Sequence, residues 1–399
     1  MAAVNTEKKG YRDEPICDSH VHLTSAMPLE QTAAWLDGYA RYFGCSRIAL
    51  LGLPHSSRAA NTDPSNNLKA LYLKSLLNSE SVPRPGAKAE SVRCLFYAFG
   101  GLFHHFDARD TASGFLAQVE ELYETGYDGV KLLLGKPELR KRLGVPLDDP
   151  LFDPFYRFCE DKAFPVTLHL GDPAAYWLPW DNGHAPNYDA SFPTLDGLRA
   201  ETEGILLKHP RLDLVLCHFY FIADDPDAAD EFLMRYPNAK FDLTPGSEMY
   251  AGFSRHPDEW CDFFRRHRTR ILFGTDADNW ARSFPLTEKD YEHNYSYIFN
   301  LVRNALEAKE PFRFEDVDWG PLIPLDPDDE TRRLIYSGNF IRRMGEPRPI
   351  APASACAAVK KLIPLYEAGE VPGSPERAAV DLKNCRVMEK YFGEDAKLS

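Results

Sequence analysis

Residues 129–170 read GVKLLLGKPELRKRLGVPLDDPLFDPFYRFCEDKAFPVTLHL, and this stretch contains the repeating unit of the fold. It begins with the apolar run 129–134 and ends with the apolar run 165–170, and apolar residues recur at helical spacing over 152–162 between them. Near-continuous apolar runs of this length are typical of parallel strands that are covered on both faces. The stretch therefore predicts a β-α-β unit with parallel strands.

The same alternation of strand and helix patterns extends over most of the chain. Further β-rich runs lie at 16–17 (leading into DSHVH), 47–53, 92–99, 212–217, 239–243 and 270–274, and further helical patterns at 29–43, 68–78, 111–125, 195–209 and 258–267. Eight strands that alternate with helices predict a (β/α)8 barrel, the TIM barrel. A doubly wound open sheet is the alternative, but no Gly-rich phosphate loop follows the first strand.

The barrel prediction covers residues 15–345. Two segments lie outside this range, and one long loop lies within it. Residues 1–14 form an expected N-terminal tail. Residues 346–399 begin with the Pro-rich PRPIAPAS and are expected to form a helical extension that packs on the barrel or on a partner subunit. Residues 174–193 form a long loop after the fifth strand, rich in aromatic residues, Pro and Gly. Loops at this end of barrel strands build the ligand face.

Composition narrows the class of protein further. The 399 residues carry a formal net charge of −14, which argues against a general nucleic-acid surface. No apolar run approaches the roughly 18 residues that a membrane span needs, and the first residues contain no apolar segment typical of a secretory signal. The eight cysteines include no CxxC pair and are expected to be reduced. We therefore expect a cytoplasmic protein that acts on a small molecule and binds neither nucleic acid nor membrane.

Polar residues at the ends of predicted strands indicate a metal site. His20 and His22 flank one valine at the end of the first strand, and side chains two apart in a strand point the same way. His169, His218 and Asp276 follow the fifth, sixth and eighth strands in the same manner. One histidine at such a position is usually a hydrogen-bonded core residue, but this many together indicate a single site. Imidazoles with a carboxylate suit zinc and also accept manganese, iron or cobalt.

Several motifs, in this order, resemble the amidohydrolase-related branch of the amidohydrolase superfamily: DSHVH, GVKLLLG through PVTLHLG, LVLCHF, ILFGTDAD and SGNFIRRMG. This branch includes aminocarboxymuconate-semialdehyde decarboxylase, resorcylate-type decarboxylases and lactone hydrolases, and the resemblance runs from about Pro15 to Gly345. It implies one divalent metal ion, most simply zinc, and favours a homodimer. By the same resemblance the metal ligands are His20, His22, His169 and Asp276, while His218 is a catalytic residue near the metal.

Three reactions or roles follow from such a site. The first hypothesis is a metal-dependent hydrolase of a lactone, ester or amide, in which Asp276 takes a proton from a metal-activated water and His218 polarises the carbonyl or protonates the leaving group. The alternative is a metal-dependent, non-oxidative decarboxylase of an aromatic or unsaturated acid, in which His218 manages the proton that replaces CO₂. A third hypothesis is a non-catalytic, metal-binding barrel.

Substrate-binding candidates lie on the same predicted face. Lys131, in the fourth strand, could face a substrate anion, could bridge two metals as a carboxylated lysine as in dinuclear relatives, or could form a structural ion pair. Arg255 could clamp a substrate carboxylate or be a surface residue. Aromatic residues of the long loop could sandwich a flat substrate or attach the loop to the barrel. The loop candidates are Tyr176, Trp177, Trp180 and His184, and His104 and His105 are expected in an exposed loop near the pocket mouth.

Overall fold

The computed structural model describes residues 14–55, 63–79, 93–178, 188–246, 248–280, 284–314 and 317–395. Its strands are β1 (Ile16–His22), β2 (Cys45–Leu51), β3 (Leu95–Gly101), β4 (Gly129–Gly135), β5 (Val166–Leu170), β6 (Leu214–Leu216), β7 (Ala239–Asp242), β8 (Ile271–Leu272) and β9 (Ala277–Asp278). The helices are α1 (Leu29–Phe43), α2 (Asn66–Asn78), α3 (Ala112–Thr125), α4 (Pro137–Leu143), α5 (Asp153–Asp161), α6 (Leu195–Lys208), α7 (Pro226–Arg235), α8 (Met249–Arg255), α9 (Pro257–Arg266), α10 (Glu288–Glu307), α11 (Asp329–Arg333), α12 (Asn339–Met344), α13 (Pro352–Glu367) and α14 (Pro375–Asp395), with short turns η2 (Ala174–Trp177), η4 (His218–Phe221) and η5 (Leu334–Gly338).

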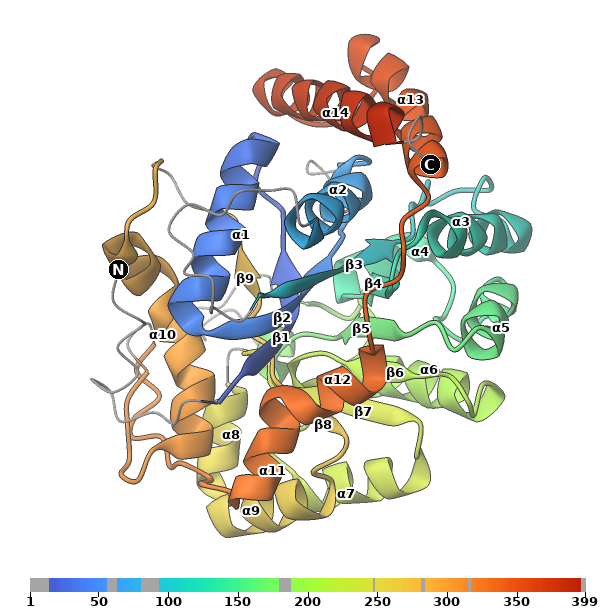
Figure 1. Ribbon diagram of the computed structural model, residues 1–399. Helices are drawn as coiled ribbons and strands as arrows, with labels where there is room; N and C mark the ends of the chain where they lie inside the picture. Colours follow the sequence, from blue (N-terminus) through green and yellow to red (C-terminus); the bar gives the residue numbers. More distant parts are fainter. Residues whose placement is uncertain are drawn as a thin grey trace.

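The strands form a parallel sheet that closes on itself. Each strand from β1 to β8 pairs with the next one in the chain, and β9 pairs with β1. β8 and β9 are the two ends of one segment, and its backbone also bonds to β1 between them: Ser19 N donates to Phe273 O (3.0 Å) and Asp276 N donates to His20 O (2.9 Å). The ring of strands, with helices around it in Figure 1, is a (β/α)8 barrel. This confirms the predicted fold over the open sheet.

The barrel interior is filled by one apolar layer, with the polar residues of β1 beyond it. The interior side chains, all buried, are Cys17, Ala49, Leu51, Tyr97, Phe99, Val215, Leu272 and Phe340. The register between β1 and β2 shifts between Asp18 and Val21. Such an irregularity re-aims the side chains that follow it. His20 and His22 are thereby free to join a polar layer, although Cys17 belongs to the apolar one.

Helix α3 shows how the local sequence sets the ends of an element. Thr111 accepts a hydrogen bond from Gly114 N (3.1 Å) and caps the start. Gly126 ends the helix with a left-handed backbone (φ 100°). A Cβ at Gly126 would lie 2.2 Å from the carbonyl oxygen of Pro349, so only glycine fits. The chain beyond the barrel therefore returns across the end of α3.

The C-terminal helices α13 and α14 pack against each other and lie beside α2 (Figure 1, red). Tyr72 of α2 contacts the rings of Tyr391 and Phe392 at centroid distances of 4.9 and 6.2 Å. Cys385, Met388 and Phe392 are fully buried. The expected N-terminal tail, apart from Glu14, lies outside the described residues. Among the described helices, none combines the length and the apolar character that crossing a membrane requires.

Candidate metal centre

Three predicted ligands converge at the carboxyl end of the barrel strands. The Nε2 atoms of His20 and His22 are 3.1 Å apart, and Asp276 Oδ1 lies 3.4 Å from the first and 3.2 Å from the second. His20 and His22 are buried, whereas the side chain of Asp276 is 38 % exposed. A tetrahedral ion with bonds of about 2.0–2.1 Å holds its ligand atoms roughly 3.3 Å apart. The spacing of these three atoms fits a divalent metal ion.

Hydrogen bonds on the far side of each ring fix the tautomers. His20 Nδ1 donates to Asp242 Oδ2 (2.9 Å), and His22 Nδ1 donates to the carbonyl of Leu51 (3.0 Å). With the proton on Nδ1, each Nε2 directs a lone pair toward Asp276. Two lone pairs and a carboxylate at this distance repel each other unless a cation lies between them. The donor set therefore suits a metal ion chemically as well as by spacing.

Lys131 brings a positive charge to the same cluster. Its Nζ lies 3.1 Å from His20 Nε2 and 3.1 Å from Cys217 Sγ, and the residue is 1 % exposed. Burial, and then the charge of Lys131, lower the pKa of His20 to about 3. His20 is thus neutral near pH 7, the form that binds metals. Removal from water raises the pKa of Asp276, but its contacts with His22, His20 and His218 together hold that pKa well below its usual range.

His169 and His218 form a second pair beside this cluster. His169 Nε2 donates to the carbonyl of Gly171 (3.1 Å), so its Nδ1 accepts the hydrogen bond from His218 Nε2 (3.0 Å). The rings of His218 and His20 are 5.5 Å apart. Burial lowers the pKa of both His169 and His218. The structure thus brings His169 next to His218 rather than into the three-residue cluster, and its role as fourth ligand stays a prediction.

The backbone is strained at two of these residues. His218 and Asp276 have φ values of 54° and 61°, and the left-handed conformation continues from His218 through Phe221. This conformation costs roughly 1–2 kcal/mol for each residue other than glycine. Strain of this kind persists where the surrounding structure enforces a side-chain position, and it concentrates at functional sites. The strain supports a functional role for the ends of strands six and eight.

Asp242, the last residue of β7, is a functional residue that the sequence reading missed. Besides binding His20, it accepts hydrogen bonds from the backbone of His218 (2.8 Å) and Thr244 (3.2 Å) through Oδ1. Burial favours the neutral acid, but the hydrogen bond from His20 and the charges of His20, His218 and Lys131 together lower the pKa of Asp242 to about 2. Its position at a strand end, like that of His169, is the signal that could have identified it.

Asp242→Asn is expected to weaken metal binding about 10- to 100-fold with little change in shape. The amide can place an N–H toward His20 Nδ1, which favours the tautomer whose proton occupies Nε2. Titration of the metal-free variant with zinc against a competing chelator measures the effect. An affinity within about threefold of the wild type would contradict the role assigned to Asp242. Asp224→Asn, at an exposed carboxylate, is the matched control.

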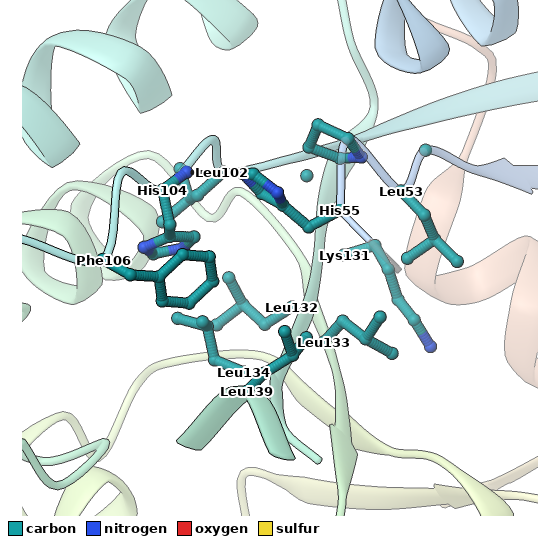
Figure 2. Close-up of a pocket in the computed structure, with 13 residues that line it drawn as sticks. Leu53, His55, Leu102, His104, Phe106, Lys131, Leu132, Leu133, Leu134 and Leu139 are labelled. Carbon is teal, nitrogen blue, oxygen red and sulfur yellow. Dashed lines mark hydrogen bonds between the residues drawn. The ribbon is translucent and has the colours of Figure 1, made fainter. Parts of the chain in front are cut away.

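A pocket opens beside Lys131, between the ends of β2, β3 and β4 (Figure 2). Its internal volume is about 20 Å³, room for about one water molecule. The walls are mainly apolar, and His55 and His104 line it on the side of Phe106. His104 is 4 % exposed, so the expectation of an exposed loop is wrong for this residue, whereas His105 is exposed. The pocket places mainly apolar walls next to the buried Lys131.

The other substrate-binding candidates lie away from these contacts. Trp177 donates from Nε1 to the carbonyl of Pro193 (3.0 Å) and packs on the ring of Tyr188 (4.9 Å). Arg255 is exposed and pairs with Asp224. Trp180 and His184 lie outside the described residues. Trp177 thus attaches the loop after β5 to itself through Pro193 and Tyr188, and Arg255 pairs α8 with Asp224. The substrate roles of Trp177 and Arg255 stay predictions.

Comparison with known families identifies the chain. Residues 97–342, more than half of the sequence, match the family model described as Amidohydrolase. The chain belongs to the amidohydrolase family. This confirms the resemblance inferred from the motifs, and it makes the protein an enzyme of the amidohydrolase superfamily with a candidate metal site of the kind that supports metal-dependent catalysis. None of the curated proteins compared with the chain matches it.

Solved structures with similar folds share little sequence with this amidohydrolase. An uncharacterised TIM-barrel protein from Bordetella bronchiseptica is 15 % identical, with 86 % of this chain and 99 % of the other covered and a TM-score of 0.49. 4-Oxalomesaconate hydratase from Rhodopseudomonas palustris is 14 % identical, with 88 % of this chain and 99 % of the other covered and a TM-score of 0.46. 5-Carboxyvanillate decarboxylase from Sphingomonas paucimobilis is 12 % identical, with 83 % of this chain and 98 % of the other covered and a TM-score of 0.44. Similarity at this level does not identify the substrate.

Proposed function

We propose that the protein is a metal-dependent hydrolase that cleaves a small carbonyl compound such as a lactone, ester or amide. The observation that carries this proposal is the position of Asp276. Its carboxylate contacts both ligand imidazoles and is nevertheless 38 % exposed, so a water molecule can reach it. By contrast, the other carboxylate of the cluster, Asp242, is 1 % exposed and occupied by His20.

The chain supplies each group that this reaction needs. His20, His22 and Asp276 would hold the metal, with His169 as the expected further ligand. A divalent ion in this position would polarise the substrate carbonyl and lower the pKa of water. Asp276, a partly exposed carboxylate next to both ligand imidazoles, would accept the proton of the attacking water. His218, neutral and next to the cluster, would exchange a proton with the leaving group.

A metal-dependent decarboxylase is the second candidate, and Lys131 favours it. A buried ammonium group beside the metal ligands, at the edge of an apolar pocket, is suited to a substrate carboxylate. In this reaction the bond between the carboxylate carbon and its neighbour breaks, CO₂ leaves, and a proton takes its place. His218 would deliver that proton, with His169 as its hydrogen-bond partner.

Product analysis decides between the two reactions. Protein reconstituted separately with Zn²⁺, Mn²⁺, Fe²⁺ and Co²⁺ is incubated with a panel of lactones, esters, amides and aromatic acids, and products are identified by mass. Addition of one water to a carbonyl substrate supports the hydrolase. Loss of CO₂ without consumption of water replaces it by the decarboxylase. Absence of turnover by every metal form, together with a bound metal, would favour the non-catalytic barrel.

A further inference from the structure

The C-terminal helix α14 reaches the loop that follows the two histidines of β1. Arg377 donates from Nη2 to the carbonyl of Thr24 (2.8 Å), two residues after His22. Asn384 donates to the carbonyl of Met27 (2.9 Å) and accepts from Leu29 N (3.2 Å). A segment far along the chain thus holds both ends of the loop 24–29. Two carbonyl groups and one N–H group of this loop are bonded to side chains of α14.

The opposite side of the same loop is bound to the segment that carries Asp276. Thr24 donates from its backbone N to Asp278 Oδ1 (2.8 Å), and its hydroxyl donates to the other oxygen of that carboxylate. Ser25 N donates to Asn279 Oδ1 (2.9 Å). Because Asp278 is two residues from Asp276, Thr24 connects α14 directly with the strand end that supplies the carboxylate ligand. The loop lies between these two attachments.

A buried group of charges fixes α14 in place. Lys69 of α2 bonds through Nζ to Asp63 Oδ2 (2.8 Å) and to Asp381 of α14, and these three side chains are at most 4 % exposed. Arg377 lies at the edge of the group, with its Nε 3.8 Å from Asp381 Oδ2. The guanidinium of Arg377 is thereby oriented between Asp381 and the carbonyl of Thr24.

Asn66 extends the connection from this group to β2. Its Nδ2 donates to the carbonyl of Leu23 (2.7 Å), the residue after His22, and its Oδ1 accepts from Leu53 N (2.7 Å). Leu53 is two residues beyond Leu51, whose carbonyl holds the ring of His22. Asn66 therefore binds both the backbone that follows His22 and the backbone that follows its hydrogen-bond acceptor, Leu51.

We propose that Arg377 is a positioning residue for the metal centre. By holding Thr24 against Asp278, it keeps His22 and Asp276 at the separation that a divalent ion requires. This inference rests on the proposed function only in that the cluster binds a metal ion, and it is independent of the reaction catalysed. Displacement of ligands by a fraction of an ångström is sufficient to weaken coordination.

Arg377→Met tests the proposal, because methionine keeps the apolar stem and removes the guanidinium. Zn²⁺ affinity is measured by competition with a chromophoric chelator, and the thermal unfolding midpoint is measured in excess chelator. We expect about tenfold weaker Zn²⁺ binding, with the unfolding midpoint of the metal-free protein within a few degrees of wild type. Arg377→Lys keeps a donor and the charge and should restore most of the affinity. Arg386→Met is the matched control, because Arg386 lies on the same helix as Arg377 and forms an exposed pair with Glu367 of α13. This variant should bind Zn²⁺ as the wild type does.

Three results would overturn the proposal: unchanged Zn²⁺ affinity in Arg377→Met, an equal loss in Arg386→Met, or a loss accompanied by a large fall in the unfolding midpoint of the metal-free protein. The last result would mean that Arg377 only stabilises the fold. Failure of the proposed function is separate. Wild-type protein that binds Zn²⁺ but hydrolyses nothing refutes the hydrolase alone, whereas wild-type protein that binds no divalent ion refutes both proposals.

Discussion

His20→Ala is expected to remove stoichiometric metal binding and to lower kcat by at least about 10³-fold, which corresponds to roughly 4 kcal/mol of lost transition-state stabilisation. His20 lies at the centre of the site, since its Nε2 contacts His22, Asp276 and Lys131 and its Nδ1 binds Asp242. Removal of its imidazole leaves His22 and Asp276 with one ligand fewer and frees Asp242 of its partner. Elemental analysis of the purified variant and steady-state kinetics on the substrate found by product analysis measure both effects.

The control for this experiment is His293→Ala, at an exposed position on α10. It should keep one equivalent of metal and the wild-type rate. A His20→Ala protein that retained both its metal and its activity would show that the metal binds elsewhere. A protein that lost activity but kept its metal would instead assign His20 to the chemistry rather than to coordination.

Asp128→Ala is expected to lower the free energy of unfolding by about 3–5 kcal/mol. Asp128 Oδ2 lies 2.7 Å from Lys74 Nζ, and both side chains are 2 % exposed. The carboxylate also accepts hydrogen bonds from Ala98 N (2.8 Å) and Arg348 N (2.7 Å). The substitution therefore leaves a buried ammonium group without its counter-charge and two backbone N–H groups without their acceptor.

Urea-induced unfolding in excess chelator provides the measurement. Lys361→Met removes an exposed pair with Glu121 and should change the free energy of unfolding by no more than about 0.5 kcal/mol. The double substitution Lys74→Met with Asp128→Ala should recover part of the loss, because it also removes the unpaired charge. A loss of less than about 1 kcal/mol in Asp128→Ala would mean that water or another group solvates Lys74.

The barrel could be predicted from sequence because its strands are covered on both faces and read as uninterrupted apolar runs. The eighth strand is only partly predictable from its sequence. The apolar run at 270–274 indicates a strand, but β9, Ala277–Asp278, consists of two residues between polar neighbours and shows no strand pattern. The pairing of β9 with β1, together with the hydrogen bonds from Ser19 and Asp276, shows that this segment closes the ring.

The sequence indicates the candidate ligands because they stand at the ends of strands, but it does not indicate which residues hold them in place. Asp242 stands at a strand end as the ligands do, but its pairing with His20, 222 positions away, cannot be read from the sequence. Lys69 is similar, since a lysine in a helix is usually exposed, and here it is buried between the nearby Asp63 and Asp381 of the distant helix α14. Such pairings depend on the tertiary arrangement and leave no local pattern. His20 and His22 show the two-residue period of a strand, whereas the residues that hold them in place show no such spacing.

Closure of the barrel also determines when the site can form during synthesis. Contacts that complete it join residues 254 positions apart, as between Ser19 and Phe273, and the bond from Leu29 to Asn384 spans 355. At about 5–20 residues per second, a ribosome needs roughly 10–50 s to make the first of these spans. During that interval β1 has an unpaired edge and its histidines have no carboxylate partner. Non-local assembly of this kind leaves the cluster of His20, His22 and Asp276 incomplete until residue 276 has been made.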